Sequence, residues 1–335
     1  IHNTAIGHDA LTALNGNAAD ASKGAYNTAI GSYSGTAITI GKQNTACGYL
    51  ALGGTDDGIK NVAVGYAALD ANCGDENIGI GFNALTAFTG SNATAIGSGA
   101  ADAAGGNTNL TAVGYGALGA ATSGNSNTAV GYNSLQTVDG ASNTAVGSEA
   151  LHADCVSNNT AVGDNALNDF TGSGATAVGA FAADAAVANT WLTAVGYGAM
   201  GAATSGNYNT AVGVSSLLTV DGGSNTAVGY AALNADCAND NTAVGKSALL
   251  SFTGSNATAV GSGAADAATS ATFLTAVGRN AAGGLLTGAG NTAIGYQSLM
   301  FADGAEARNV ALGAHAARFC DGTDDCIAIG YCALS

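Results

Sequence analysis

Small apolar residues recur along this chain in short clusters at a nearly fixed interval. The pentapeptide Asn-Thr-Ala-Val/Ile-Gly, with substitutions, closes at 20 glycines: Gly7, Gly31, Gly48, Gly65, Gly81, Gly97, Gly114, Gly131, Gly147, Gly163, Gly179, Gly196, Gly213, Gly229, Gly245, Gly261, Gly278, Gly295, Gly313 and Gly330. The steps from Gly31 onward are nearly equal, and the step from Gly7 to Gly31 is longer. A nearly fixed period indicates stacked repeats.

Each position of the repeat keeps its character. The residue before the glycine is Val, Ile, Leu or Cys in all 20 repeats, and the residue two before is Ala in 19. Thr lies three before in 16 repeats and Asn four before in 13. The third residue after the glycine is Ala or Ser throughout, and the fourth is usually Leu. Each repeat therefore reads Asn-Thr-Ala-Val-Gly-x-x-Ala-Leu, followed by polar and small residues.

These short clusters predict an all-β fold, a parallel β-solenoid of about 20 coils of about 16–17 residues. No helical period accounts for β-branched clusters separated by Gly. We expect two short strands on opposite sides of each coil, one of them at positions such as 160–162. The glycine would allow a backbone bend that a Cβ would obstruct.

A longer period, which spans five coils, lies on top of the coil period. It relates four sets: Cys73, Cys155 and Cys237; Phe88, Phe170 and Phe252; Asp102, Asp184 and Asp266; and Asp139, Asp221 and Asp303. The pattern indicates duplication of a five-coil unit. We predict one elongated domain over 1–335, irregular over 1–48 and regular over 49–330. Ala37–Gly41 imitates the motif and leaves the register there open.

The strand pattern also predicts self-association. In Thr-Ala-Val, Thr and Val share one face and Ala lies on the other, and neither face is charged. Strands that are apolar on both faces are normally covered on both, so we expect a partner chain, with a homotrimer preferred. The pattern leaves open which face points inward.

The composition limits the classes of partner that we expect for this chain. The 335 residues include 52 Gly and no Pro, and the formal net charge is −16. Such an acidic chain is a poor ligand for nucleic acid or for an anionic membrane surface. No transmembrane segment or signal peptide is evident, and the first residue is Ile. We therefore expect a processed product or the ordered part of a longer protein.

The Asn-Thr-Ala-Val-Gly-x-x-Ala-Leu coil resembles the head repeats of YadA-like trimeric autotransporter adhesins. It is also similar to phage tail-fibre proteins with tandem copies of this motif. The resemblance covers nearly the whole chain. It implies a left-handed β-roll in a homotrimeric, surface-exposed fibre, and it implies no catalytic residue. The chain shows no coiled-coil stalk, barrel anchor or chaperone domain.

Candidate chemistry is sparse. His152 lies shortly before Cys155, but a triad needs a cleft, and we expect no catalytic residue, no cofactor-binding residue and no metal ligand. Cys47 takes the Val position and is expected to be a buried small hydrophobe. The three cysteines of the five-coil period are expected to be free thiols or links between chains. Cys320 and Cys326 flank a turn and are candidates for a disulfide.

Two clusters of aspartates in turns suggest the hypothesis that the chain binds calcium. Asp56 and Asp57 form one cluster, and Asp321, Asp324 and Asp325 form another. Calcium needs six to eight oxygen ligands and a suitable loop. Solvated turn residues are the simpler interpretation.

Aromatic residues often follow the repeat glycine directly. Those that we predict to form a glycan-contact stripe are Tyr66, Tyr115, Tyr132, Tyr197, Tyr230 and Tyr296. The alternative is that these rings pack along the ladder and cover backbone edges.

The sequence therefore predicts a structural and adhesive fibre, extracellular at a cell surface or on a virion, that attaches to a host glycan or protein receptor. It is not expected to be an enzyme. The alternatives are a bacterial trimeric adhesin head, an ice-binding protein that uses the Thr ladder, and a filament-forming matrix subunit.

Overall fold

The chain forms an all-β parallel solenoid in which each coil contributes one short strand. A computed structural model describes residues 2–14, 23–285, 287–301, 305–319, 322 and 324–335. Contacts divide the chain into two compact units, Ile1–Asn168 and Asp169–Ser335. The prediction of a single domain stays a prediction. Among the described residues no helix occurs, so none is long and apolar enough to cross a membrane.

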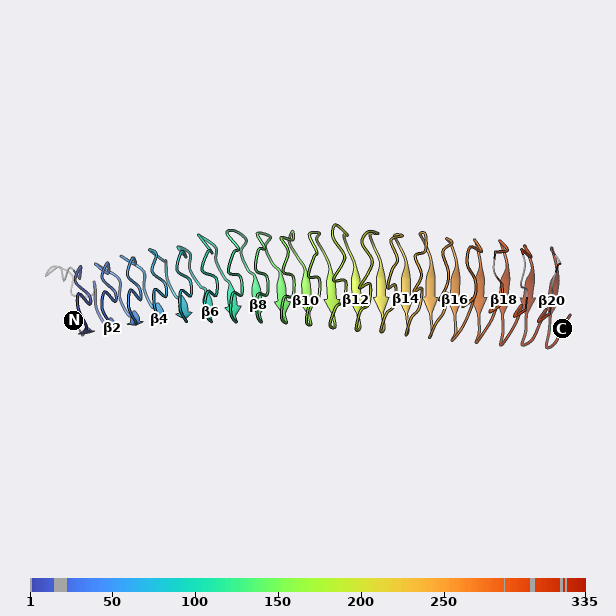
Figure 1. Ribbon diagram of the computed structural model, residues 1–335, viewed down its shortest axis with the longest axis horizontal. Coiled ribbons are helices and arrows are strands. Elements are labelled where there is room, and N and C mark those ends of the chain that lie inside the picture. Colours follow the sequence, from blue (N-terminus) through green and yellow to red (C-terminus); the bar gives the residue numbers. More distant parts are fainter. Residues whose placement is uncertain (1, 15–22, 286, 302–304, 320–321, 323) are drawn as a thin grey trace. The chain divides into compact units, whose positions relative to one another are not determined.

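The first unit contains ten short strands. They are β1 (Thr4–Ile6), β2 (Thr28–Ile30), β3 (Thr45–Cys47), β4 (Val62–Val64), β5 (Ile78–Ile80), β6 (Thr94–Ile96), β7 (Thr111–Val113), β8 (Thr128–Val130), β9 (Thr144–Val146) and β10 (Thr160–Val162). Consecutive strands pair in parallel with like residues opposite, as for Ala145 and Ala161. In Figure 1 they lie side by side, one arrow to a coil.

The second unit repeats this arrangement. Its strands are β11 (Thr176–Val178), β12 (Thr193–Val195), β13 (Thr210–Val212), β14 (Thr226–Val228), β15 (Thr242–Val244), β16 (Thr258–Val260), β17 (Thr275–Val277), β18 (Thr292–Ile294), β19 (Val310–Leu312) and β20 (Ile327–Ile329). The parallel register again places like residues opposite, as for Thr210 and Thr226. The solenoid prediction is therefore confirmed in both units.

Our prediction of a second strand in each coil is wrong. The Gly-x-x-Ala-Leu segment forms turns in which alternate residues take positive φ, as in Asn83 (55°) and Leu85 (56°). These residues still bond to neighbouring coils: the Asn83 N–H donates to Tyr66 O at 2.9 Å, and the Leu85 N–H donates to Ala100 O at 3.0 Å. The ladder of hydrogen bonds therefore continues without β geometry. Ala37–Gly41 likewise forms no strand.

The interior is filled by the small residue at the centre of each strand, by side chains of the turn segment and by residues just after it. In all strands except β1, the central residue is buried, and Ala145 and Ala161 are typical. Leu69, Leu85 and Phe88 are buried completely. The question of which face points inward is thus answered: the Ala face is the core, and Thr and Val face outward.

A buried asparagine ladder holds successive coils together. The Asn143 N–H donates to Asn127 Oδ1 at 2.8 Å, and the Asn159 N–H donates to Asn143 Oδ1 at 2.9 Å. The Asn143 side chain also donates to Val156 O at 3.1 Å. Each amide satisfies backbone groups that burial would otherwise leave unpaired.

Candidate functional site

The aromatic residues of the predicted stripe all lie on the surface. Each follows the glycine that ends a strand, so its ring leaves the coil where the backbone bends. The exposed side chains are Tyr66, Tyr115, Tyr132, Tyr197, Tyr230 and Tyr296. The glycan contact itself stays a prediction.

The rings also form stacks along the ladder, as the alternative interpretation expects. In the first unit Tyr49 and Tyr66 stack with centroids 5.3 Å apart, and Tyr66 and Phe82 stack at 5.1 Å. Two coils beyond Phe82, the stacking resumes between Tyr115 and Tyr132 at 5.6 Å. The coil between these two runs carries a serine in the aromatic position.

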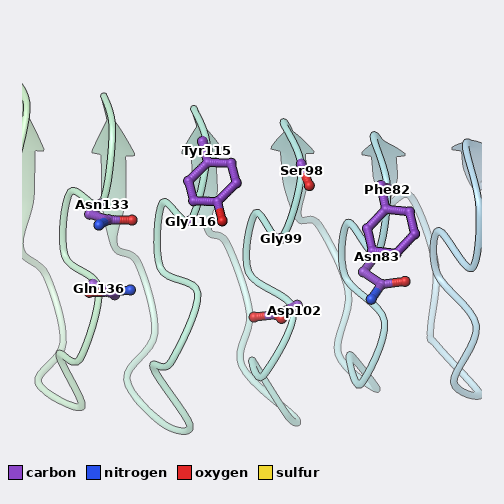
Figure 2. A pocket seen from close by; sticks show the side chains of 9 residues that line it. All are labelled: Phe82, Asn83, Ser98, Gly99, Asp102, Tyr115, Gly116, Asn133 and Gln136. Carbon is purple, nitrogen blue, oxygen red and sulfur yellow. The ribbon is translucent and has the colours of Figure 1, made fainter.

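A surface hollow of about 270 Å³ lies at this interruption. Figure 2 shows Phe82 and Tyr115 on either side of Ser98 and Gly99. The lining residues belong to four successive coils. Those not yet named are Asn83, Asp102, Gly116, Asn133 and Gln136. We call this feature the Ser98 hollow. Sequence reasoning missed it, although the gap in the aromatic ladder was a readable signal.

Polar groups line the hollow beside the rings. The Asn133 Oδ1 atom is buried and accepts no hydrogen bond. Gln136 Oε1 pairs with His152 Nε2 at 2.6 Å, which leaves the Gln136 amide nitrogen as a donor. Partial burial raises the pKa of the Asp102 carboxyl above its usual value. The hollow thus combines two aromatic walls with both hydrogen-bond acceptors and a donor.

The outer strand face is a second exposed feature. The Val or Ile before the glycine is exposed by 38% at Val146, 37% at Val162 and 36% at Val212. Thr lies beside it, partly exposed, in rows that match from coil to coil. None of the strands contains a charged residue. We call this surface the Thr–Val face.

The cysteines occupy two different environments. Cys47 is exposed, so its predicted burial is wrong, because the Val position faces outward. Cys73, Cys155 and Cys237 are buried free thiols, which argues against links between chains. Burial raises the pKa of Cys155 to about 11. Cys320 lies outside the described residues, so its pairing with Cys326 stays a prediction.

The other candidate sites are not assembled. His152 bonds to Gln136 rather than to Cys155. Asp325 pairs with Arg308 at 2.5 Å, and Asp321 lies outside the described residues. In the described part of the chain, no three His, Cys, Asp or Glu side chains come together to hold a metal ion.

No protein-family model matches the sequence, and a search of curated proteins finds no match.

Proposed function

We propose that this protein is a structural and adhesive fibre element, exposed on a cell surface or a virion, that self-associates and attaches to a host surface. A homotrimer is the preferred assembly. The observation that carries this proposal is the uncovered Thr–Val face. Parallel sheets are normally covered on both faces, and long apolar surfaces mark sites of interaction.

Covering the exposed apolar surface would favour association. Fully burying a Val side chain contributes about 1.5–3 kcal/mol. With 37% of Val162 exposed, covering it would contribute about 0.5–1 kcal/mol. Ten such rows in one unit sum to several kcal/mol before the cost of association. An uncharged, repetitive strip suits a second copy of the same chain, because its rows match the partner's rows.

A closed symmetric assembly explains why this face would not produce open aggregates. A three-fold bundle covers one face of each chain and then stops growing. The net charge of −16 keeps the remaining surfaces apart. A host glycan or protein would then be met by surfaces outside the bundle, such as the aromatic stripe.

Native mass spectrometry of the purified chain tests the assembly. We expect a multiple of 31.9 kDa, with three copies preferred. The double variant Val146→Lys and Val162→Lys should release monomers, because it places unpaired charges in the interface. The matched control is Val156→Lys with Val187→Lys, which adds the same charge at exposed valines outside the strands. A wild-type monomer at micromolar concentration, or equal behaviour of the two double variants, would contradict the proposal.

The outward Thr row favours ice binding as a second candidate function. Thr144 and Thr160 lie opposite each other on adjacent strands and face outward, at the regular spacing of a sheet. A nanolitre osmometer separates the candidates. The fibre proposal predicts no thermal hysteresis, since the assembly covers this face. Hysteresis that disappears in Thr144→Leu with Thr160→Leu would favour the ice-binding candidate.

A further inference from the structure

The Ser98 hollow is the place of one missing ring in the aromatic stack that runs from Tyr49 to Tyr132. Phe82 and Tyr115 flank it from coils two steps apart, which at about 4.8 Å per strand is about 9.6 Å. Stacked rings elsewhere in this ladder have centroids 5.1 to 5.6 Å apart. The separation therefore admits one ring-sized group, which would contact an aromatic wall on each side.

The backbone leaves this space open. Gly99 has a φ of +64°, and a Cβ placed there would meet only Asp102 Oδ2, at 3.9 Å. The equivalent residues of two other coils, Asn83 and Asn133, also have positive φ. Asparagine is therefore compatible with this conformation, and its absence at Gly99 keeps the floor of the hollow clear.

The polar lining selects the kind of ring. The buried Asn133 Oδ1 has no partner, and a buried acceptor without a donor is costly. Asp102 supplies a carboxylate, and the Gln136 amide supplies a donor. A purely apolar ring would leave these groups unsatisfied. The carboxylate and the net charge of −16 oppose a phosphorylated or acidic ligand.

We infer that the Ser98 hollow binds one uncharged pyranose ring, held between Phe82 and Tyr115 with its hydroxyls donating to Asp102 and Asn133. The C–H faces of the sugar stack on the aromatic walls, and its edge carries the hydroxyls that the polar lining requires. The site would supply a glycan contact for the attachment role proposed above, and its biological function rests on that proposal.

The rest of the chain offers internal comparisons. Tyr197 and Tyr230 also flank a position without an aromatic ring, but Val214 occupies it and is exposed there. Asp184 repeats Asp102 in the next five-coil unit, but the residue equivalent to Phe82 is Asp164. The aromatic pair and the carboxylate thus meet at the Ser98 hollow and not at these two equivalents.

Saturation-transfer NMR with methyl pyranosides of glucose, galactose, mannose and N-acetylglucosamine tests the site on the full chain. We expect transfer from aromatic protons to at least one pyranoside. Ser98→Tyr should abolish it by completing the stack, while Ser148→Tyr is the matched control outside the hollow. Asp102→Asn should weaken binding about tenfold or more, and the control Asp184→Asn should leave it unchanged.

Three outcomes would overturn the inference. They are no transfer to any of the four pyranosides, equal transfer in wild type and Ser98→Tyr, and stronger binding of phenol or adenosine than of any pyranoside. Circular dichroism of each variant shows whether its fold is intact, and Gly99→Asn provides a second way to fill the hollow. Native mass spectrometry on the same samples separates the two proposals: lost sugar binding in an intact oligomer contradicts the site alone.

Discussion

The repeat glycine should tolerate a side chain poorly, and Gly147→Ala tests this directly. Gly147 has a φ of +145°, and a Cβ there would lie 2.6 Å from the carbonyl carbon of Gly163 in the next coil. That carbonyl cannot retreat easily, because the Gly163 N–H donates to Val146 O at 2.8 Å. The added methyl group therefore meets backbone on a coil that is itself held in place.

The cost follows from two terms. A non-glycine residue in this backbone region costs about 1–3 kcal/mol. Moving the next coil away loses at least one buried hydrogen bond, at about 1–3 kcal/mol. We expect Gly147→Ala to destabilise the surrounding coils by about 2–6 kcal/mol.

The matched control is Gly105→Ala in the same unit. Gly105 has no positive φ, and its added Cβ would meet only the Thr122 carbonyl oxygen at an ordinary 3.6 Å. This substitution should be neutral or should stabilise by about 0.4–1 kcal/mol through the unfolded chain.

Native-state hydrogen exchange is the suitable assay, because stacked repeats open locally rather than all at once. The amides of β9 and β10 should exchange much faster in Gly147→Ala, while those of Gly105→Ala should match the wild type. Equal protection in the two variants would refute the argument that the glycine stack is sterically required.

Three further outcomes are expected. Asn143→Ala removes the acceptor of the Asn159 N–H, so it should cost about 1–3 kcal/mol and deprotect that amide; unchanged exchange would argue against the ladder. Burial raises the pKa of Cys237 to about 12 from 9.0, so its thiol should react with Ellman's reagent far more slowly than the exposed Cys47. Because the pKa of this thiol is higher in the folded than in the unfolded chain, the free energy of unfolding should fall as the pH rises above about 9. Urea unfolding at two alkaline pH values would reveal this loss. Burial acts to raise the pKa of Asp139, but backbone and side-chain hydrogen bonds hold it below 3.8, so acid should weaken its turn and Asp139→Asn should remove that pH dependence.

The sequence by itself determined the repeat, the position of the Thr-Ala-Val strand in each coil and the role of the glycines. Matching residues recur at each coil, so the register of Ala145 opposite Ala161 follows from the period alone. The tertiary structure decided the conformation of the Ala-Leu segment. Leu85 is apolar and predicts a strand, yet its φ is 56°, because the coil must turn there while keeping its bonds to both neighbours.

Which face of the strand points into the core also became clear only from the structure. Ala, Thr and Val are all compatible with burial, so their pattern could not say which side is the core. Packing decides it: the centre of the strand faces buried leucine side chains, as at Gly79, where an added Cβ would already lie 3.1 Å from Leu69 Cγ. A small residue such as Ala161 fits there, and the larger Val162 is turned outward. The Ser98 hollow depends on the same stacking, since Phe82 and Tyr115 belong to coils that a whole further coil separates in the sequence. Only coil-on-coil packing places their rings on either side of one serine.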